Sequence, residues 1–429
     1  MMRDPGRLAG PLMLAMTLLA VLHGLWPSLP LHLSGAAGWA AMLLLLPNIG
    51  RHQRYQAVAM IVVGAAGLAW AGLQGGNMRL GHALSGHAML LAMLIAVSFV
   101  RLVALPRSDQ DERLPQGRGE IWRTLLGVHL FGAAINFTAL VIMGDRLALR
   151  RPLSLPQAQV LARGFSAAAH WSPFFAAMAV ALTNAPGSSL GTLAPIGVAI
   201  ALVALGLGGS LLARQPESAR FYGYPMHFEA LTVPALLTTG VLAVHWAFPT
   251  IPILAVIALL ALSVTVGLLW IRPDGARRQR LAEHVNDGLP RMAGELVLFL
   301  AAGVLAAGVA STIATNYPDL AVSAFGPTEA TALLLAMTAA SLAGIHPVIT
   351  IAVAGGALGP WVTDPNLLGI TFLMAWAAGV VVSPFSVLLI TLQGRYGIGP
   401  LRMIRANACY VLLLLVVDAI ALQIYAAWS

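Results

Sequence analysis

The 429-residue chain has few charged residues and a single cysteine. Charged side chains make up 9% of the residues, whereas a soluble domain has about 25%. Hydrophobic residues make up 59%, so the chain cannot cover a soluble surface with polar groups, and a soluble enzyme is excluded. The lone Cys409 excludes an internal disulfide and any CxxC metal or redox motif.

The chain also has no lysine: its 24 basic residues are all Arg, and its formal net charge is +8. Arg-rich cytoplasmic loops are typical of membrane proteins, because positive charge there sets the topology. The positive charge is therefore explained without nucleic acid as a partner. We expect a multi-pass protein of the cytoplasmic (inner) membrane, in contact with the lipid bilayer.

Apolar stretches follow one another along nearly the whole chain, from residue 8 to residue 427. A transmembrane helix needs about 20 apolar residues, and helices satisfy their own backbone hydrogen bonds in lipid. The sequence therefore predicts an all-α polytopic membrane protein, with about 10–12 transmembrane helices for stretches of this length.

One apolar stretch in the first half is not expected to cross the membrane. Arginine clusters at residues 107–123 and 146–151 flank the single stretch 122–144. Both clusters should be cytoplasmic by the positive-inside rule. Either 122–144 or 157–186 is then a re-entrant hairpin, and the charges do not decide between them.

A second hairpin is predicted at residues 327–360. A helix rises about 1.5 Å per residue, so a straight helix of this length would overshoot a hydrocarbon core of about 30 Å. Gly344 and Pro347 interrupt the stretch. We expect a helix–break–helix hairpin that enters and leaves on the same side.

Two proline windows, residues 170–186 and 344–360, indicate an internal duplication. Each has a His, His170 or His346, close before the first of two prolines that are thirteen residues apart. Inverted repeats with broken helices near the midplane are the usual architecture of secondary transporters. We therefore expect an inverted repeat with these segments: scaffold helices in 1–120, repeat 1 in 121–227, scaffold helices and a cytoplasmic loop in 228–293, and repeat 2 in 294–429.

Residues 344–386 contain two further motifs: a turn, Thr363-Asp364-Pro365-Asn366, and Gly379 followed by Ser383-Pro384-Phe385-Ser386. This stretch resembles the C-terminal half of the large membrane subunit of TRAP-type transporters, and more broadly the ion transporter superfamily that includes divalent anion:sodium symporters. Phe385 stands where those families have a second proline. The resemblance implies an elevator-type carrier whose hairpins meet at a midplane site, with Na⁺ or H⁺ coupling and no other cofactor.

Proline breaks define the expected site. A Pro inside a membrane helix frees a backbone carbonyl, and facing breaks supply carbonyls to a cation and helix N-termini to an anion. The expected helix-break residues are Pro173, Pro347, Pro365 and Pro384. The expected substrate-binding donors lie near them: His170, Ser172, Thr183, Asn184, His346, Thr363, Asn366, Ser383 and Ser386.

Asp364 is the expected ion-coupling carboxylate, although its place before a helix also suits a helix cap. Asp418 lies deep in the last apolar stretch, but the sequence shows no partner for it. Asp418 is therefore not included in the site, and no metal site is expected.

The sequence favours an ion-coupled secondary transporter of a small organic anion, such as a dicarboxylate or tricarboxylate, and not an enzyme. A cation/proton antiporter or an oxyanion exporter of the same fold is an alternative. A polytopic enzyme acting on lipid-linked substrates is another, and it would depend on the acidic cluster Asp109, Asp111 and Glu112. A homodimer, a periplasmic binding protein and a small membrane subunit are left open as partners.

Overall fold

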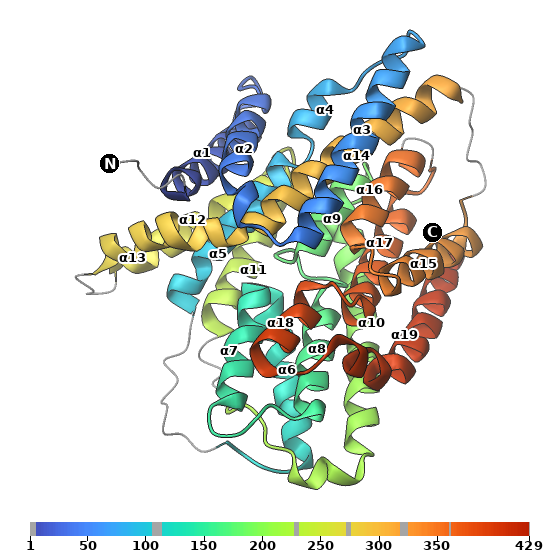
Figure 1. Ribbon diagram of the computed structural model, residues 1–429. Coiled ribbons are helices and arrows are strands. Elements are labelled where there is room, and N and C mark those ends of the chain that lie inside the picture. The colour runs from blue at the N-terminus through green and yellow to red at the C-terminus, as the bar shows by residue number, and fades with distance from the viewer. Residues whose placement is uncertain are drawn as a thin grey trace. The chain divides into compact units, whose positions relative to one another are not determined.

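The computed structural model describes residues 6–104, 114–226, 231–271, 276–317, 325–359 and 362–428 (Figure 1). Over these residues the secondary structure is helical, apart from one isolated bridge between Gln116 and Tyr222. Eight of the described helices are long and apolar enough to cross a membrane, and two shorter apolar helices span residues 235–247 and 347–358. The all-α polytopic fold is confirmed. The acidic cluster at residues 109–112 lies outside the described residues.

The chain divides into two compact units. Unit 1 comprises residues 1–104, 235–321 and 352–361, and unit 2 comprises residues 105–234, 322–351 and 362–429. The predicted repeat 2 begins with a helix that belongs to unit 1, so the units and the predicted segments divide the chain at different points. The predicted segment boundaries stay predictions.

Unit 1 is held together by close helix–helix packing. A Cβ on Gly64 would lie 2.5 Å from the Val304 carbonyl oxygen, and one on Gly308 would lie 2.2 Å from the Gly64 carbonyl oxygen. Small residues let membrane helices approach to this distance. The helices of unit 1 are α1 (Gly6–Leu25), α2 (His32–Leu45), α3 (Arg51–Leu73), α4 (Leu80–Ser85), α5 (Ala88–Ala104), most of α11 (Thr232–Ala247), α12 (Ile253–Ile271), α13 (Arg277–Glu283) and α14 (Ala293–Asn316).

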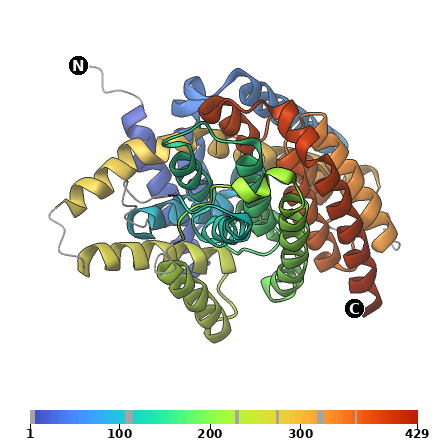
Figure 2. The same cartoon turned by 90° about the horizontal axis from the view of Figure 1, so that it is seen from below.

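Unit 2 contains the remaining helices. They are α6 (Arg118–Ile135), α7 (Phe137–Ala148), α8 (Leu155–Ala168), α9 (Ala176–Asn184), α10 (Leu190–Ala213), α15 (Pro327–Leu342), α17 (Pro365–Val382), α18 (Val387–Tyr396) and α19 (Pro400–Trp428), while α16 (Pro347–Leu358) is divided between the two units. In both views α15 (orange) lies beside α19 (red) (Figures 1 and 2).

The order of elements in unit 2 repeats. The series α6–α7, α8–α9 and α10 is followed later in the chain by α15–α16, α17–α18 and α19. The sequence Ser-Pro-Phe separates α8 from α9 at residues 172–174, and again separates α17 from α18 at residues 383–385. Equivalent turns have positive φ angles: Asn136 (55°) and Gly344 (99°) after α6 and α15, and Gly187 (95°) and Gly397 (71°) before α10 and α19.

The predicted pairing of the two proline windows is therefore wrong. Pro173 lies in the break between α8 and α9, whereas Pro347 is the first residue of α16, where a missing N–H removes no helical hydrogen bond. The partner of Pro173 in the repeated order is Pro384. Pro360, which ends the second window, lies outside the described residues.

The structure selects the helical hairpin in the first half. The helices α6 and α7 meet at Asn136, and a Cβ on Gly127 would lie 3.3 Å from the Met143 methyl carbon. Residues so far apart in sequence are in contact only if the chain folds back at Asn136. The hairpin therefore falls in the 122–144 stretch, and its re-entrant relation to a membrane stays a prediction.

The predicted break in residues 327–360 is confirmed. The helix α15 ends at Leu342 with a hydrogen bond from the Ile345 N–H to the Ala340 carbonyl (3.0 Å) and with Gly344 at positive φ. This is the Schellman arrangement, which terminates a helix at a left-handed residue. The helix α16 then begins at Pro347. Entry and exit on the same side stay a prediction.

We expect Gly308→Ala to lower the unfolding temperature of the detergent-solubilised protein, because the added methyl group would collide with the α3 backbone. Overpacking of this kind costs about 1–3 kcal/mol. Gly267→Ala in α12 is the matched control, since nothing lies within 4 Å of its Cβ position. Equal unfolding temperatures for the two variants would contradict the close approach of α3 and α14.

Candidate functional site

All the expected site residues lie in unit 2, most of them around α17. Every residue of α17 from Leu367 to Val382 is buried. The helix is enclosed by α8, α9, α10, α15 and α19. The expected site residues of the second half therefore gather at the two ends of this central helix and not along it.

At the N-terminal end of α17, Asp364 caps the helix. Its Oδ1 atom accepts hydrogen bonds from the N–H groups of Asn366 (2.9 Å) and Leu367 (3.2 Å). The Asn366 side-chain oxygen accepts a hydrogen bond from the Ser189 N–H (2.9 Å), which joins α17 to the turn before α10. Pro365 is the first residue of α17 and does not break a helix, and Thr363 is exposed.

At the C-terminal end of α17, the chain breaks at Ser383-Pro384-Phe385-Ser386. Pro384 has no N–H to donate to the carbonyl four residues earlier. The Ser386 hydroxyl caps α18 by accepting the Leu389 N–H (3.2 Å). The Ser383 hydroxyl is fully buried and makes no hydrogen bond. A buried donor without a partner is rare in native proteins, and one at a helix break is a candidate ligand contact.

The turn between α15 and α16 packs against this break. A Cβ on Gly379, one helical turn before Ser383, would lie 2.8 Å from the Ser341 hydroxyl oxygen and 2.9 Å from Pro347 Cγ. The Ser341 hydroxyl is also buried without a hydrogen-bond partner. Two unsatisfied hydroxyls therefore lie where the turn meets the end of α17, and Ser341 is a candidate that the sequence reasoning missed.

His346 lies in the same turn. Its ring contacts the Trp376 ring of α17 edge to face, with centroids 5.7 Å apart, and its Nδ1 accepts the Val348 N–H (3.2 Å). His170 has different neighbours, so the structure shows no contact between the two histidines. A site shared by His170 and His346 stays a prediction.

The polar residues of the α8–α9 segment are mostly bonded within the protein. The Ser172 hydroxyl donates to the Ala133 carbonyl and accepts the Phe174 N–H. The side chains of Thr183 and Asn184 donate to carbonyls of their own helix, at 2.7 and 2.9 Å. These bonds leave the three residues with less free hydrogen-bonding capacity than Ser383 and Ser341.

A buried pair involves the carboxylate that the sequence reasoning left out. His170 Nε2 lies 3.9 Å from Asp418 Oδ1, with the two side chains 1% and 0% exposed. The Asp418 oxygens and His170 Nε2 make no hydrogen bond. The apolar sequence around Asp418 already indicates a functional role, because an acidic residue is costly inside a membrane helix and is usually functional. Its partner comes from a distant segment.

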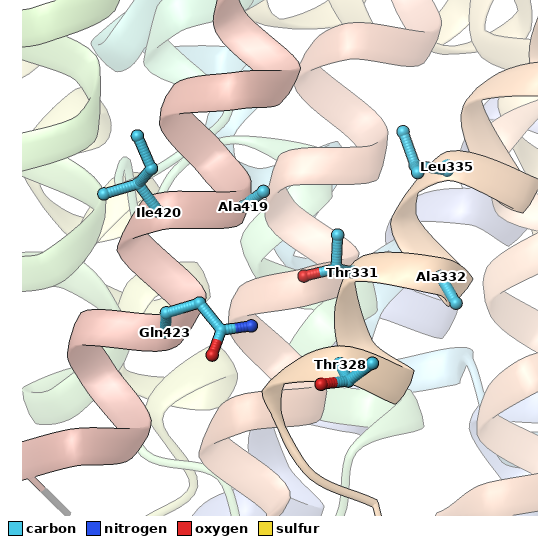
Figure 3. Close-up of a pocket in the computed structure, with 7 residues that line it drawn as sticks. All are labelled: Thr328, Thr331, Ala332, Leu335, Ala419, Ile420 and Gln423. Carbon is cyan, nitrogen blue, oxygen red and sulfur yellow. The ribbon is translucent and has the colours of Figure 1, made fainter.

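A shallow hollow of about 370 Å³ lies between α15 and α19, and none of the expected site residues lines it (Figure 3). Thr328, Thr331 and Gln423 contribute polar groups, and the rest of the lining is apolar: Ala332, Leu335, Ala419 and Ile420. It contains no charged group to bind an anion or cation. The hollow is therefore not the site that the sequence predicts.

Unit 1 contains a more polar hollow of about 290 Å³. His284 lies in it, with Nδ1 2.8 Å from an Arg101 nitrogen and Nε2 3.0 Å from the Ser98 hydroxyl. Its lining also includes two basic and two acidic residues: Arg280, Arg291, Glu283 and Asp287. Among the residues that the structure describes, no three His, Cys, Asp or Glu side chains come together as metal ligands would.

No protein-family model matches the chain, and the comparison with curated proteins found no match. The resemblance to TRAP-type transporters is therefore not supported by a family match. Among solved structures, the chain is similar to the YdaH transporter of Alcanivorax borkumensis, with 15% sequence identity and a TM-score of 0.46 over 87% of this chain and 86% of that chain. A likeness at this level carries no argument about function.

We expect Asp364→Ala to destabilise the protein by about 1 kcal/mol, because loss of an N-cap side chain leaves helix N–H groups unsatisfied. Asp364→Asn should keep nearly full stability, since the amide oxygen can accept the same two bonds. The measurement is the unfolding midpoint of both variants. Equal losses in the two would show that the negative charge, and not the cap, is what stabilises this turn.

Proposed function

We propose that the chain is an ion-coupled secondary transporter of a small organic anion across the cytoplasmic membrane. One observation carries the proposal: the unsatisfied hydroxyls of Ser341 and Ser383 lie where a helix break meets the turn of a second broken segment. Discontinuous helices that present free polar groups are the usual binding sites of secondary transporters. Neither hydroxyl is needed to hold the fold by a hydrogen bond.

The chemistry of this region favours an anionic ligand. Hydroxyl groups donate hydrogen bonds to carboxylates, and such charge-assisted bonds are the stronger kind. The helix α18 begins directly after the break, and the N-terminus of a helix favours negative charge. No Arg lies between residues 326 and 394, so we infer that neutral donors hold the carboxylate groups of the substrate.

The division of the chain supports a moving-body mechanism. An elevator transporter moves one compact body against another, and the chain forms two compact units of which α16 contributes to both. In this proposal unit 2 holds the substrate, and Na⁺ or H⁺ supplies the driving force. Asp364 remains a proposed ion-coupling residue, with Oδ1 capping α17 and the carboxylate also hydrogen-bonded to Tyr425 of α19.

The decisive experiment is uptake into proteoliposomes over a panel of dicarboxylates and tricarboxylates, with imposed Na⁺ or pH gradients. We expect gradient-dependent accumulation of at least one member of the panel. Liposomes without protein control for leakage. Failure to move any carboxylate, together with pH-dependent cation flux, would favour the antiporter alternative; accumulation of oxyanions alone would favour the exporter.

We expect Ser383→Ala and Pro384→Ala each to weaken substrate binding. Loss of one charge-assisted hydrogen bond costs about 1.5–3 kcal/mol, or one to two decades in affinity. Pro384→Ala restores an N–H that can close the helix, so it should lower uptake more than stability. Uptake and unfolding temperature are measured side by side.

The matched control for these variants is Thr371→Val, which removes a fully buried hydroxyl of α17 that donates to the Leu367 carbonyl (2.8 Å). Its uptake should remain close to that of the unmodified protein. Unchanged uptake in Ser383→Ala and Pro384→Ala would mean that the break is only a kink and that the site lies elsewhere.

A further inference from the structure

Asp418 is the most isolated carboxylate that the structure describes in unit 2. Its side chain is fully buried in α19, and neither oxygen accepts a hydrogen bond. An uncompensated charge in a low-dielectric interior is strongly destabilising. The group that faces Asp418 therefore determines how its charge can be compensated.

That group is the imidazole of His170. Its Nδ1 atom lies 3.2 Å from the Ala167 carbonyl oxygen. A carbonyl oxygen only accepts, so Nδ1 carries the hydrogen and Nε2 presents a lone pair. Nε2 faces Asp418 Oδ1 at 3.9 Å. Two acceptor atoms thus face each other with no hydrogen between them, and one added proton would satisfy both.

The neighbouring Arg163 does not neutralise Asp418. Its guanidinium donates to the Asn407 side chain (2.9 Å) and to the carbonyls of Gly208 (3.0 Å) and Ala406 (3.4 Å), and it lies 4.8 Å from the centre of the Tyr410 ring. Arg163 meets Asn407 and His170 meets Asp418, so α8 and α19 run parallel along this polar seam. The seam is buried, and it contains Arg163 and Asp418 without a hydrogen bond between them.

Tyr410 of α19 is fully buried beside the pair, with its ring against Arg163 and its hydroxyl without a hydrogen bond. The other ionisable groups around the pair are engaged or exposed. His129 of α6 accepts a hydrogen bond from the Trp171 indole (3.1 Å). The helices α10 and α17 contain no ionisable side chain, and Glu329 of α15 is exposed. Arg395 and Tyr396 of α18 bond to Asp145, and Cys409, Arg402 and Arg405 of α19 are exposed.

We propose that His170 and Asp418 form a proton-binding pair, and that the proton held there is the coupling ion of transport. The second part rests on the proposed function. A proton taken up from one side forms a carboxylic acid on Asp418 that donates to His170 Nε2, and it leaves on the other side, so nothing else is consumed. A hydrogen bond requires about 2.7–3.0 Å, so proton binding draws α19 towards the residue that precedes the α8–α9 break.

The first test detects the proton without transport. Infrared spectra of the purified protein in nanodiscs are recorded from about pH 5 to 9, a range that covers the ordinary titration of a histidine. We expect the C=O band of a protonated carboxylic acid to appear as the pH falls and to be missing in Asp418→Asn. His170→Gln should shift the midpoint of this band by about one pH unit, because the two groups titrate as a pair.

Asp145→Asn is the matched control for the spectra, because Asp145 is a partly exposed carboxylate paired with Arg395 at 2.6 Å. It should leave the Asp418 band unchanged. Asp418→Asn resembles the protonated acid in shape and charge, so we expect it to fold, and its elution volume and unfolding temperature check this. A wild-type band that does not respond to pH, or one that persists in Asp418→Asn, overturns the pair.

The second test follows proton movement. Proteoliposomes loaded with the pH dye pyranine receive each member of the carboxylate panel in turn. We expect proton entry to accompany uptake in the unmodified protein. In Asp418→Asn, uptake driven by a pH gradient should fall at least about tenfold, while exchange of labelled for unlabelled carboxylate continues.

The two tests separate the two proposals. If no carboxylate moves but the infrared band titrates and depends on Asp418, the proposed function fails and the proton pair stands. If uptake follows a Na⁺ gradient and is indifferent to pH and to Asp418→Asn, transport stands and the proton is not its coupling ion. Both results are read on the same protein preparation.

Discussion

Unit 2 depends on how backbone breaks are satisfied in apolar surroundings. A helix that stops inside a membrane leaves N–H and C=O groups without partners, and each unsatisfied group is expensive. Most ends in this unit are closed locally, by the side chains of Asp364 and Ser386 and by the left-handed turns at Gly344 and Gly397. Beside the break after α17, two side-chain hydroxyls, those of Ser341 and Ser383, are buried without a hydrogen bond.

The fold class and the break before Pro347 could be predicted because both follow from local composition. Length and apolarity determine helices in lipid, and Gly344 and Pro347 mark an interruption in any context. The serines of the Ser383–Ser386 break could be named for the same reason. Proline alone, however, does not distinguish a helix start from a helix break, since Pro is favoured at the first position of a helix. Pro365 and Pro347 were expected to break helices, and both begin one.

The register of the repeat and the partner of Asp418 could not be predicted, for a different reason. The repeat is marked by positive φ angles at four turns: Asn136, Gly187, Gly344 and Gly397. The equivalent turns after α6 and α15 have different residues, Asn136 and Gly344, at this position. Asp418 meets His170 only because α8 and α19 pack side by side, and no local pattern in either helix reports that contact. The contact between His170 and Asp418 is therefore set by tertiary packing, which periodicity and composition do not predict.

The interior of unit 2 has an apolar part around α17 and a separate polar part between α8 and α19. The central α17 is buried along its length and contains no ionisable group, whereas the α8–α19 seam holds Arg163, His170, Tyr410 and Asp418. Placing charge on one seam keeps the electrostatic cost away from the α17–α18 break, where the Ser383 hydroxyl has no hydrogen-bond partner. The substrate region and the proton pair are thus distinct in chemistry but share the segment around the α8–α9 break.

The single cysteine of the chain lies on that seam's outer side. Cys409 is exposed and directly precedes the buried Tyr410 in α19. Because no other thiol competes, a spin label or a fluorophore can be attached there without first removing cysteines. The natural protein thus provides one addressable position on the helix that carries Asp418, from which movements of α19 can be followed in a membrane.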